Sequence, residues 1–485
     1  MKSLWNAAKA AVDPDRLLQA TMAGLIETTR WKYATLDESE RTVWKPGEAL
    51  KLFLAGYTGT RNTGADVRVE EMIRQLRHVV GDEQLELTLI TSDWNLSRSY
   101  FSGVRQVTLP NIFPPFLFNE VPKHHGVVAC EGSMFKSKFA DALSTMMAGA
   151  LGMANAEGKV SVGYGAEAGA MSDGLSRFVE NACSKSLVIC RNEPSRDVLG
   201  ALGVRTTSGT DTAWTFEPAP ESVGRGILER AGWDGVKPVL VLCPINPFWW
   251  PVKPSLVKAA AKSFAGEFGE EHYRSIYFHT WDAERQAKLD TYLDGWAEAT
   301  KRFAAKHDVF PICVGMEQLD RESCEALADR LGPETPVLVS DTFDMYELVS
   351  VLHRCRYMVS SRYHAIVTSM NGRVPSCGVT MDERIRNLMN DRNHPDLFCE
   401  VEVPDLAERL LTMLERLHDD GDEIADDIAG ALPGQLKKMG EMGIAFADEL
   451  QRVYPDLRLP VRSRTWDAHL PPLQPLVSAV CEEYA

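Results

Sequence analysis

YMVSSRYHAIVTSMNGRVPSCGV, residues 357–379, predicts a buried strand, a helix and a second buried strand. Ser360 and Ser361 stand where they can cap the helix. Arg362 and His364 fall in its first turn, where unpaired backbone N–H groups favour an anion. Because parallel α/β sheets bind their ligands at the carboxyl ends of the strands, we expect a fixed cation and a titratable imidazole to flank one anion site here.

The length of the chain predicts two domains, since 485 residues exceed what one hydrophobic core usually organises. Apolar runs of strand length alternate with helical patterns, which favours doubly wound parallel sheets of the Rossmann type. In the first half we expect strands at residues 49–55, 85–90, 126–131, 159–163 and 186–190. In the second half we expect them at residues 238–243, 275–278, 309–314, 337–340, 357–360 and 374–379.

The domain boundaries follow from a break in this rhythm. Residues 206–222 are rich in turn-forming residues, so we place the crossing between the domains there. The predicted N-terminal Rossmann-like domain is 49–215, and the C-terminal one is 216–400. Residues 1–48 are expected to form a helical appendage, and residues 401–485 helices that fold back over the core.

Charge and composition limit the classes of partner. The net charge of −16 argues against a broad surface for nucleic acid or anionic membranes. A local pocket for a small anion is still compatible with this charge, because salt screens the repulsion from exposed charges more than about 8 Å away. No run approaches the roughly 18 apolar residues of a membrane span. Asp13, Asp15 and Arg16 interrupt what a secretory signal would need as an apolar core. We therefore expect a cytoplasmic protein with no integral membrane segment and no nucleic-acid partner. The ten cysteines show no CxxC pair, so no metal site is expected.

A glycine loop follows the first predicted strand. In GYTGTRNTGADVRVEE, residues 56–71, Gly59 and Gly64 let the backbone turn sharply and approach a ligand, and Asn62 can hydrogen-bond it. A tight turn that needs glycine but holds no ligand is the alternative interpretation.

Two other strand ends carry charged candidates for ligand binding. Glu131 follows the strand predicted at 126–131, and Arg191 follows the one at 186–190. For Arg191, a simple capping ion pair involving Glu193 is the alternative. Trp249 and Trp250, flanked by prolines, can stack on a sugar, form a lip over a cleft or simply pack against a helix.

The chain resembles polysaccharide pyruvyl transferases over about residues 50–392. The motifs that carry the resemblance, in the family's order, are the glycine loop, Arg191 with NEPSRDVLGALGV behind it, Asp211, and SSRYHAIVTSMNGRVPSCGVTMDERI. The most specific piece is Arg362-Tyr363-His364-Ala365. The resemblance implies two Rossmann-like lobes that face each other across a cleft, as in glycosyltransferase-B enzymes. It also implies transfer of the enolpyruvyl unit of phosphoenolpyruvate onto a sugar as a cyclic ketal.

The resemblance further implies that Arg191, Arg362 and His364 surround phosphoenolpyruvate, the co-substrate; no cofactor is expected. Two arginine forks suit a ligand with a carboxylate and a phosphate. An imidazole can deliver the proton that the methylene carbon needs. The helix dipole should lower the pKa of His364 when the site is empty, and a bound trianion should raise it, so we expect substrate binding to convert His364 into the acid. The alternative is a histidine that only caps or packs.

The chain also departs from the family pattern. Ala65 follows Gly64, which displaces the acidic residue to Asp66 and rotates it by about 100° on a helix. Glu131 stands where relatives have glycine, and it can replace Asp66 as a base or repel the donor. Arg384 stands in place of a lysine. The remaining predicted substrate contacts are Gly59, Asn62, Gly64, Ser361 and Tyr363.

Three functions are compatible with these residues. The first is pyruvyl transfer to a glycan or a lipid-linked sugar. The second is a glycosyltransferase of the same two-lobed shape, in which Arg362 would hold the diphosphate of a nucleotide sugar. The third is a non-catalytic glycan-binding or scaffold protein, which the displaced Asp66 and the new Glu131 favour. The acceptor and the oligomeric state are not predicted.

Overall fold

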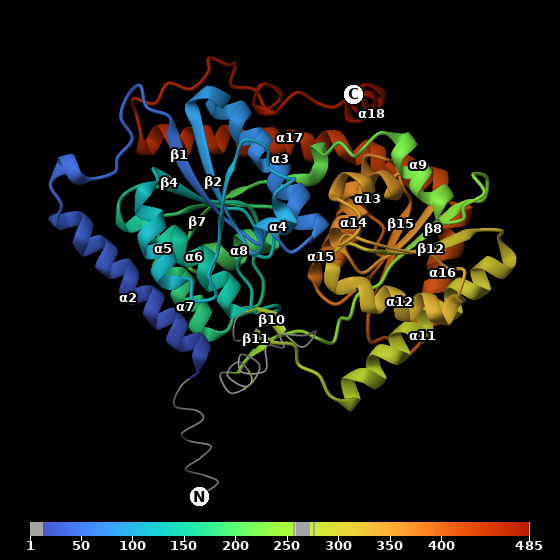
Figure 1. Cartoon of the computed structure of the whole chain (residues 1–485). Coiled ribbons are helices and arrows are strands. Elements are labelled where there is room, and N and C mark those ends of the chain that lie inside the picture. Colours follow the sequence, from blue (N-terminus) through green and yellow to red (C-terminus); the bar gives the residue numbers. More distant parts are fainter. Residues whose placement is uncertain (1–12, 256–257, 259–271, 275–276, 485) are drawn as a thin grey trace, which may run out of the picture.

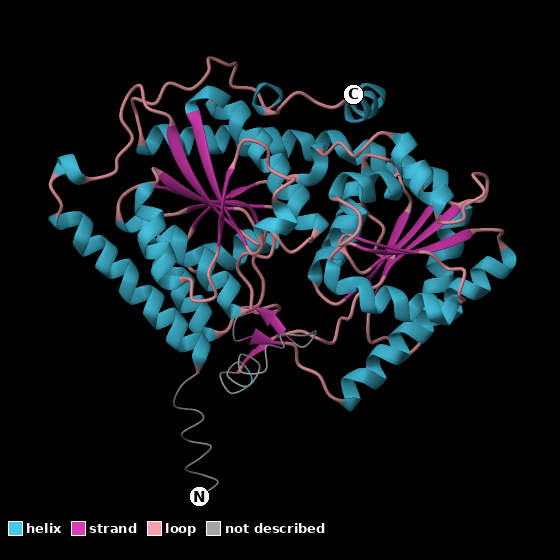
Figure 2. Cartoon of the chain, in the orientation of Figure 1, coloured by secondary structure: helices cyan, strands magenta, loops and turns pink. Residues whose placement is uncertain are grey.

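The structure is a computed structural model that describes residues 13–255, 258, 272–274 and 277–484. Two parallel sheets with helices on both faces form two lobes (Figures 1 and 2). The strands of the first sheet are β1 (Leu50–Ala55), β2 (Leu85–Thr91), β3 (Arg105–Thr108), β4 (Gly126–Ala129), β5 (Val160–Ala166), β6 (Leu187–Cys190) and β7 (Arg205–Ser208). Those of the second are β8 (Val239–Cys243), β12 (Phe310–Gly315), β13 (Val337–Val339), β14 (Tyr357–Ser360), β15 (Ser376–Thr380) and β16 (Phe398–Glu400).

Both sheets have the strand order of a doubly wound fold, which confirms the predicted class. The first is ordered β3-β2-β1-β4-β5-β6-β7 and the second β13-β12-β8-β14-β15-β16, and every pairing is parallel. The order reverses between β1 and β4 in one sheet and between β8 and β14 in the other. Crevices open at such points, so the loops after these four strands lie where ligands are expected.

Burial explains which strands the sequence reveals. The central strands β4 and β8 are buried along their whole length, as strands covered by helices on both faces must be, and they form continuous apolar runs. The edge strands β3, β7 and β16 are short and partly exposed, and β3 and β7 are largely polar, so the apolar pattern does not predict them. The prediction that residues 275–278 form a strand of the second parallel sheet is wrong. Residues 275–276 lie outside the described residues, and β11 (Tyr277–Phe278) pairs antiparallel with β9 (Lys253–Pro254) and β10 (His272–Arg274) in a separate small sheet.

Helices cover both faces of each sheet (Figure 2). In the first lobe they are α2 (Pro14–Thr35), α3 (Thr63–Val80), α4 (Trp94–Ser97), α5 (Pro114–Glu120), α6 (Asp141–Ala156), α7 (Asp173–Ala182) and α8 (Glu193–Ala201). In the second they are α9 (Glu221–Arg230), α11 (Ala283–Lys306), α12 (Arg321–Leu331), α13 (Met345–Leu352), α14 (Tyr363–Met370), α15 (Glu383–Asp391) and α16 (Leu406–Asp419). The long helix α17 (Gly421–Val453) then returns to the first lobe and packs against α3 and β5, and α18 (Pro475–Tyr484) packs on α17. The predicted domain boundaries stay predictions.

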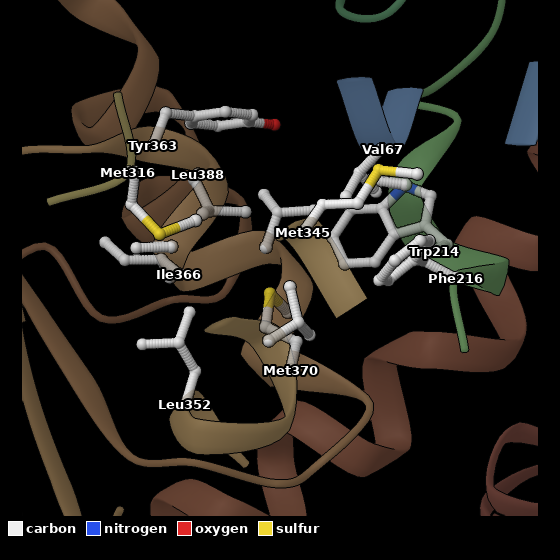
Figure 3. Packing of buried hydrophobic residues seen from close by; sticks show 14 of the residues in the cluster. Val67, Trp214, Phe216, Met316, Met345, Leu352, Tyr363, Ile366, Met370 and Leu388 are labelled. Atoms are coloured by element: carbon white, nitrogen blue, oxygen red, sulfur yellow. The ribbon is translucent and has the colours of Figure 1, made fainter. Parts of the chain in front are cut away.

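One hydrophobic core runs through both lobes. Val67 of α3 and the adjoining Trp214 and Phe216 belong to the same cluster of buried side chains as Met345 of α13 and Met370 of α14 (Figure 3). A second cluster lies on the other face of the first sheet, beneath α2, α6 and α7. The lobes are therefore joined by an apolar contact. None of the described helices is long and apolar enough to cross a bilayer.

Two glycines of α9 give a matched test of the packing that anchors the second lobe. A Cβ at Gly224 would lie 2.5 Å from the Ser350 carbonyl oxygen of α13, whereas one at Gly226 would have only the Arg230 side chain at 3.3 Å. Gly224→Ala should lower the free energy of unfolding by about 1–3 kcal/mol because the backbone of α13 must move. Gly226→Ala should raise it by about 0.5–1 kcal/mol, since alanine favours a helix over glycine. Urea denaturation of the two variants checks this, and equal stabilities would contradict the packing described.

Candidate active site

A buried carboxylate joins the two lobes. Asp211 lies beyond the end of β7 in the first lobe and is fully buried. Its Oδ2 is 3.2 Å from Nε2 of His364, the second residue of α14 in the second lobe. Because a carboxylate only accepts, the neutral imidazole carries its hydrogen on Nε2. Asp211 therefore fixes the tautomer and orientation of the predicted catalytic histidine.

Close backbone contact holds the other side of the same imidazole. A Cβ at Gly64, in the first turn of α3, would lie 2.4 Å from Nδ1 of His364. No side chain fits there without moving the histidine. Gly64 is therefore needed for contact between the lobes, a role that the predicted backbone approach to a ligand did not include.

Two buried arginines share the Asp211 carboxylate. Arg68 Nε and Arg191 Nη1 lie 3.1 Å and 3.0 Å from its Oδ2, and both side chains are almost completely buried. Arg191 also pairs with Glu167. The capping alternative for Arg191 is wrong, because Glu193 pairs with Arg196 instead.

The protonation of this group follows from its charges. Burial by itself would raise the pKa of Asp211, but Arg68, His364 and Arg191 hold that pKa well below its usual range, so the carboxylate stays ionised. Burial is the main cause that lowers the pKa of His364, and Asp211 partly opposes it. With its pKa below the ordinary value, His364 is mainly neutral at pH 7.

The second predicted arginine is held by different carboxylates. Arg362 Nε is 2.8 Å from Asp320 Oδ2, and its Nη2 is 2.9 Å from Glu317 Oε2. Glu317 also accepts hydrogen bonds from Tyr57 and Asn62 of the first lobe, at 3.3 Å and 3.2 Å. This group is thus a second bridge between the lobes.

The structure divides the site predicted as one cavity into two adjacent pockets. Arg191 lines one, together with Asp211 and Tyr363, and Arg362 lines the other, together with Glu131; Arg384 lines both. The Arg191 guanidinium lies 4.7 Å from the centre of the Tyr363 ring. The expectation that Arg191 and Arg362 face one common cavity is wrong, because each lines a different pocket. His364 lines neither of the two pockets.

Arg384 keeps the most hydrogen-bonding capacity of these arginines. It is the second residue of helix α15, its Nε contacts Asp382 at 2.8 Å, and its guanidinium lies over the Phe139 ring at 5.2 Å. Within the described residues neither of its Nη groups has a hydrogen bond. A planar fork of two uncommitted nitrogens can bind a carboxylate or a phosphate at the boundary between the pockets.

Several predicted contacts have structural roles instead. Ser361 is buried and bonds Val379 O and, at 2.8 Å, the Tyr292 hydroxyl, so its predicted cap is wrong; Arg362 is the N-cap of α14, and no side chain caps the helix. Gly59 has a positive φ of 75°, and a Cβ there would lie 2.0 Å from Thr91 Oγ1, as in the turn without a ligand. Asn62 caps α3 through Ala65 N at 3.1 Å.

The two candidate bases are placed differently. Asp66 is only 2% exposed and lines neither pocket, and burial raises its pKa well above the ordinary value. Glu131 lines the Arg362 pocket, where Oε1 accepts a hydrogen bond from Ser133 N at 3.2 Å. Of the two, only Glu131 can meet a ligand in either pocket as described.

Sequence reasoning missed two cations of the site, Arg68 and Lys136. Arg68 lies on α3 and donates to the Gly165 carbonyl at 2.8 Å besides pairing with Asp211. Lys136 Nζ lies 3.0 Å from Glu383 Oε1 and 3.6 Å from Glu167 Oε1, and burial lowers its pKa to about 8. In the sequence, a charged residue on a helix or in a loop is indistinguishable from a solvated one. In the described part of the chain no group of three or more His, Cys, Asp or Glu side chains is arranged to hold a metal.

Comparison with known proteins finds a similarity to one family. Residues 147–383, which include Arg191, Asp211, Arg362 and His364, match the family model described as polysaccharide pyruvyl transferase. The chain is thus similar to polysaccharide pyruvyl transferases over this segment. The predicted resemblance is confirmed over these residues, and with it the expectation of a transferase. No curated protein matches the chain significantly.

Solved structures with a similar fold come from nucleotide-sugar epimerases. A protein of Listeria monocytogenes assigned as UDP-N-acetylglucosamine 2-epimerase is similar at 12% identity and a TM-score of 0.51, covering 83% of this chain and 97% of its own. The UDP-N-acetylglucosamine 2-epimerase of Rickettsia bellii is 12% identical with a TM-score of 0.49, covering 84% of this chain and 99% of its own. The first of these likenesses, with the two parallel sheets, confirms the glycosyltransferase-B-like arrangement predicted for the chain.

Replacement of the shared carboxylate should have a large effect on stability. Asp211→Asn leaves the buried Arg68 without a carboxylate partner and Arg191 with Glu167 alone, and breaking such a buried pair costs about 3–5 kcal/mol. Asp448→Asn, at the exposed pair with Arg464, should cost about 0–1 kcal/mol. Denaturant unfolding of both variants tests this. A similar small cost in the two would mean that the Asp211 group does not hold the lobes together.

Proposed function

We propose that the protein transfers the enolpyruvyl group of phosphoenolpyruvate to two hydroxyl groups of a glycan or lipid-linked sugar, forming a cyclic ketal, on the cytoplasmic side of the cell. The family match supports the proposal. The observation that carries it is the position of Arg384, a guanidinium with two uncommitted nitrogens between the pocket of Arg191 and the pocket of Arg362. Such a group suits a small ligand with two anionic ends.

The chemistry assigns separate tasks to the site. Two acceptor O–H bonds break and two C–O bonds form at C2 of the donor, while the bond from C2 to the phosphate oxygen breaks. The two acceptor hydroxyl groups lose two protons in total. In the overall balance one proton is added to the methylene carbon, which becomes a methyl group, and the other leaves with the phosphate as hydrogen phosphate. Arginines hold the anionic groups, and an acid close to C3 supplies the proton.

His364 is the proposed acid, and its surroundings set a condition. In the arrangement described, Nε2 faces Asp211 and Nδ1 faces Gly64. Proton delivery therefore requires that the lobes separate slightly at Gly64 when the donor enters. A trianion near the imidazole would raise its pKa and favour the protonated form. Arg191 would exchange a carboxylate partner for the donor in the same step, with Arg384 beside it.

A transferase that uses a nucleotide sugar is the second candidate. The likeness of the fold to a protein assigned as a UDP-N-acetylglucosamine 2-epimerase favours it. Arg191 and Arg362 are already paired with carboxylates, which is also compatible with the third function, a glycan-binding protein without catalysis. The donor distinguishes these possibilities, because phosphoenolpyruvate, a nucleotide sugar, or neither would bind.

Donor binding should depend on Arg384. We expect phosphoenolpyruvate to raise the melting temperature and Arg384→Gln to weaken its binding by about 10- to 100-fold, since charge-assisted hydrogen bonds contribute about 1.5–3 kcal/mol each. The matched control is Arg386→Gln on the same helix, where the exposed side chain pairs with Glu400. Thermal-shift titration measures both. A shift with UDP-N-acetylglucosamine and none with phosphoenolpyruvate would favour the second candidate.

Turnover should depend on His364. His364→Asn should lower kcat by about 10²- to 10⁴-fold, the usual contribution of a general acid, while the thermal shift with phosphoenolpyruvate remains. Release of inorganic phosphate in the presence of a glycan acceptor is the measurement. Near-normal turnover in this variant would remove His364 from the chemistry.

A further inference from the structure

The pocket of Arg362 has aromatic walls from both lobes. Tyr57 and Phe139 come from loops of the first lobe, and Trp249 and Trp250 from the loop after β8 in the second. The Trp249 ring stacks on His279 at a centroid distance of 4.5 Å and an angle of 7°, and Trp250 meets Phe139 edge to face at 5.2 Å. The two tryptophans are thus both packed and part of a pocket wall. Rigid aromatic walls are suited to the apolar face of a sugar ring.

Two buried polar atoms of this pocket have no hydrogen-bond partner in the part of the chain that the structure describes. One is Glu131 Oε2, and the other is Asn246 Nδ2, on a residue that is only 2% exposed. The Asn246 amide orientation is set because its Oδ1 accepts the Phe248 N–H at 3.1 Å. Glu131 follows β4 and Asn246 follows β8, so the two atoms belong to the crevice-forming strand ends of opposite lobes. A buried polar atom without a partner costs about 1–3 kcal/mol, which a ligand can recover.

The pairing of these atoms selects the ligand chemistry. A carboxylate oxygen accepts and an amide N–H donates, and a hydroxyl group does both. The other carboxylates of the pocket, Glu317 and Asp320, are taken up by Arg362, whereas Glu131 has no ion pair among the described residues. A ligand carboxylate or phosphate beside Glu131 would be repelled. The pocket therefore favours an uncharged, hydroxyl-rich ring.

We propose that this pocket binds the acceptor as a neutral sugar residue, stacked on the Trp249–Trp250 wall, with one hydroxyl between Glu131 and Asn246. This inference rests on the proposed function. Glu131 Oε2 takes the proton of that hydroxyl as its oxygen forms the bond to C2 of the donor, while the C2–C3 double bond opens and C3 receives the proton from His364. Asn246 Nδ2 donates to the same hydroxyl oxygen. Arg384, shared with the neighbouring pocket, holds the donor next to it. Glu131 thereby replaces the displaced Asp66 as the base.

Saccharide binding is tested without the donor. Saturation-transfer NMR with methyl β-D-galactoside, methyl β-D-glucoside and methyl β-D-galacturonide probes the intact protein. At least one neutral glycoside should bind, and the galacturonide should bind at least about tenfold more weakly, as an unfavourable charge contact of about 1.4 kcal/mol requires. Trp250→Ala and Asn246→Ala should each weaken the neutral glycoside at least about tenfold. The controls are Trp31→Ala and Asn181→Ala, both at exposed positions of other helices.

The role of Glu131 needs a second readout. Glu131→Gln should keep binding of glycoside and of phosphoenolpyruvate but lose phosphate release by about 10²-fold or more, with loss of the acidic limb of the pH–rate profile. Glu180→Gln, at an exposed position of α7, should change neither.

Each result decides separately between the two proposals. Failure of every neutral glycoside to bind, or equal binding of the galacturonide, overturns the acceptor pocket even if phosphoenolpyruvate binds. Glycoside binding that depends on Trp250 and Asn246, with no response to phosphoenolpyruvate, supports the pocket and overturns the proposed donor. An unchanged pH–rate profile in Glu131→Gln overturns its role as base.

Discussion

The ion cluster centred on Asp211 organises the contact between the lobes. One buried oxygen of this carboxylate, Oδ2, contacts the guanidinium groups of Arg68 and Arg191 and the imidazole of His364. Taking these charges out of water is costly, so the ionised carboxylate needs its two guanidinium partners. Two glycines leave space for these guanidinium groups. A Cβ at Gly132 would lie 2.8 Å from an Arg191 nitrogen, and one at Gly165 would lie 2.9 Å from an Arg68 nitrogen. The missing side chains make room for the cations.

The same arrangement explains why the site consists of two pockets. Tyr363 and Arg384 stand between Arg191 and Arg362 and separate a cavity rich in paired charges from one with aromatic walls. In a transferase, donor and acceptor must lie next to each other with little water between them. A shared guanidinium at the boundary meets that requirement, because it can hold one substrate while the other occupies the adjoining space.

The sequence predicted those parts of the structure that local rules determine. The central strands are continuous apolar runs, and Arg362 and His364 fall at the start of a helix because the strand before them and the apolar spacing after them leave little choice. Local rules failed where partners are distant in the chain. Arg68 has the spacing of an ordinary helical residue, and only the approach of β7 and α14 makes it part of the site. Ser361 is of a residue type that often caps helices, but its hydroxyl is hydrogen-bonded to Tyr292 from another helix.

The continuous apolar core has a consequence for dissecting the protein. Trp214 and Phe216 lie at the crossing between the lobes and are buried against side chains from both of them (Figure 3). A fragment cut at this crossing would expose an aromatic patch to water, and it would also lack α17, which returns to β5 from the far end of the chain. Neither half is therefore an autonomous folding unit, and loss of structure in one lobe should spread to the other as a single cooperative event.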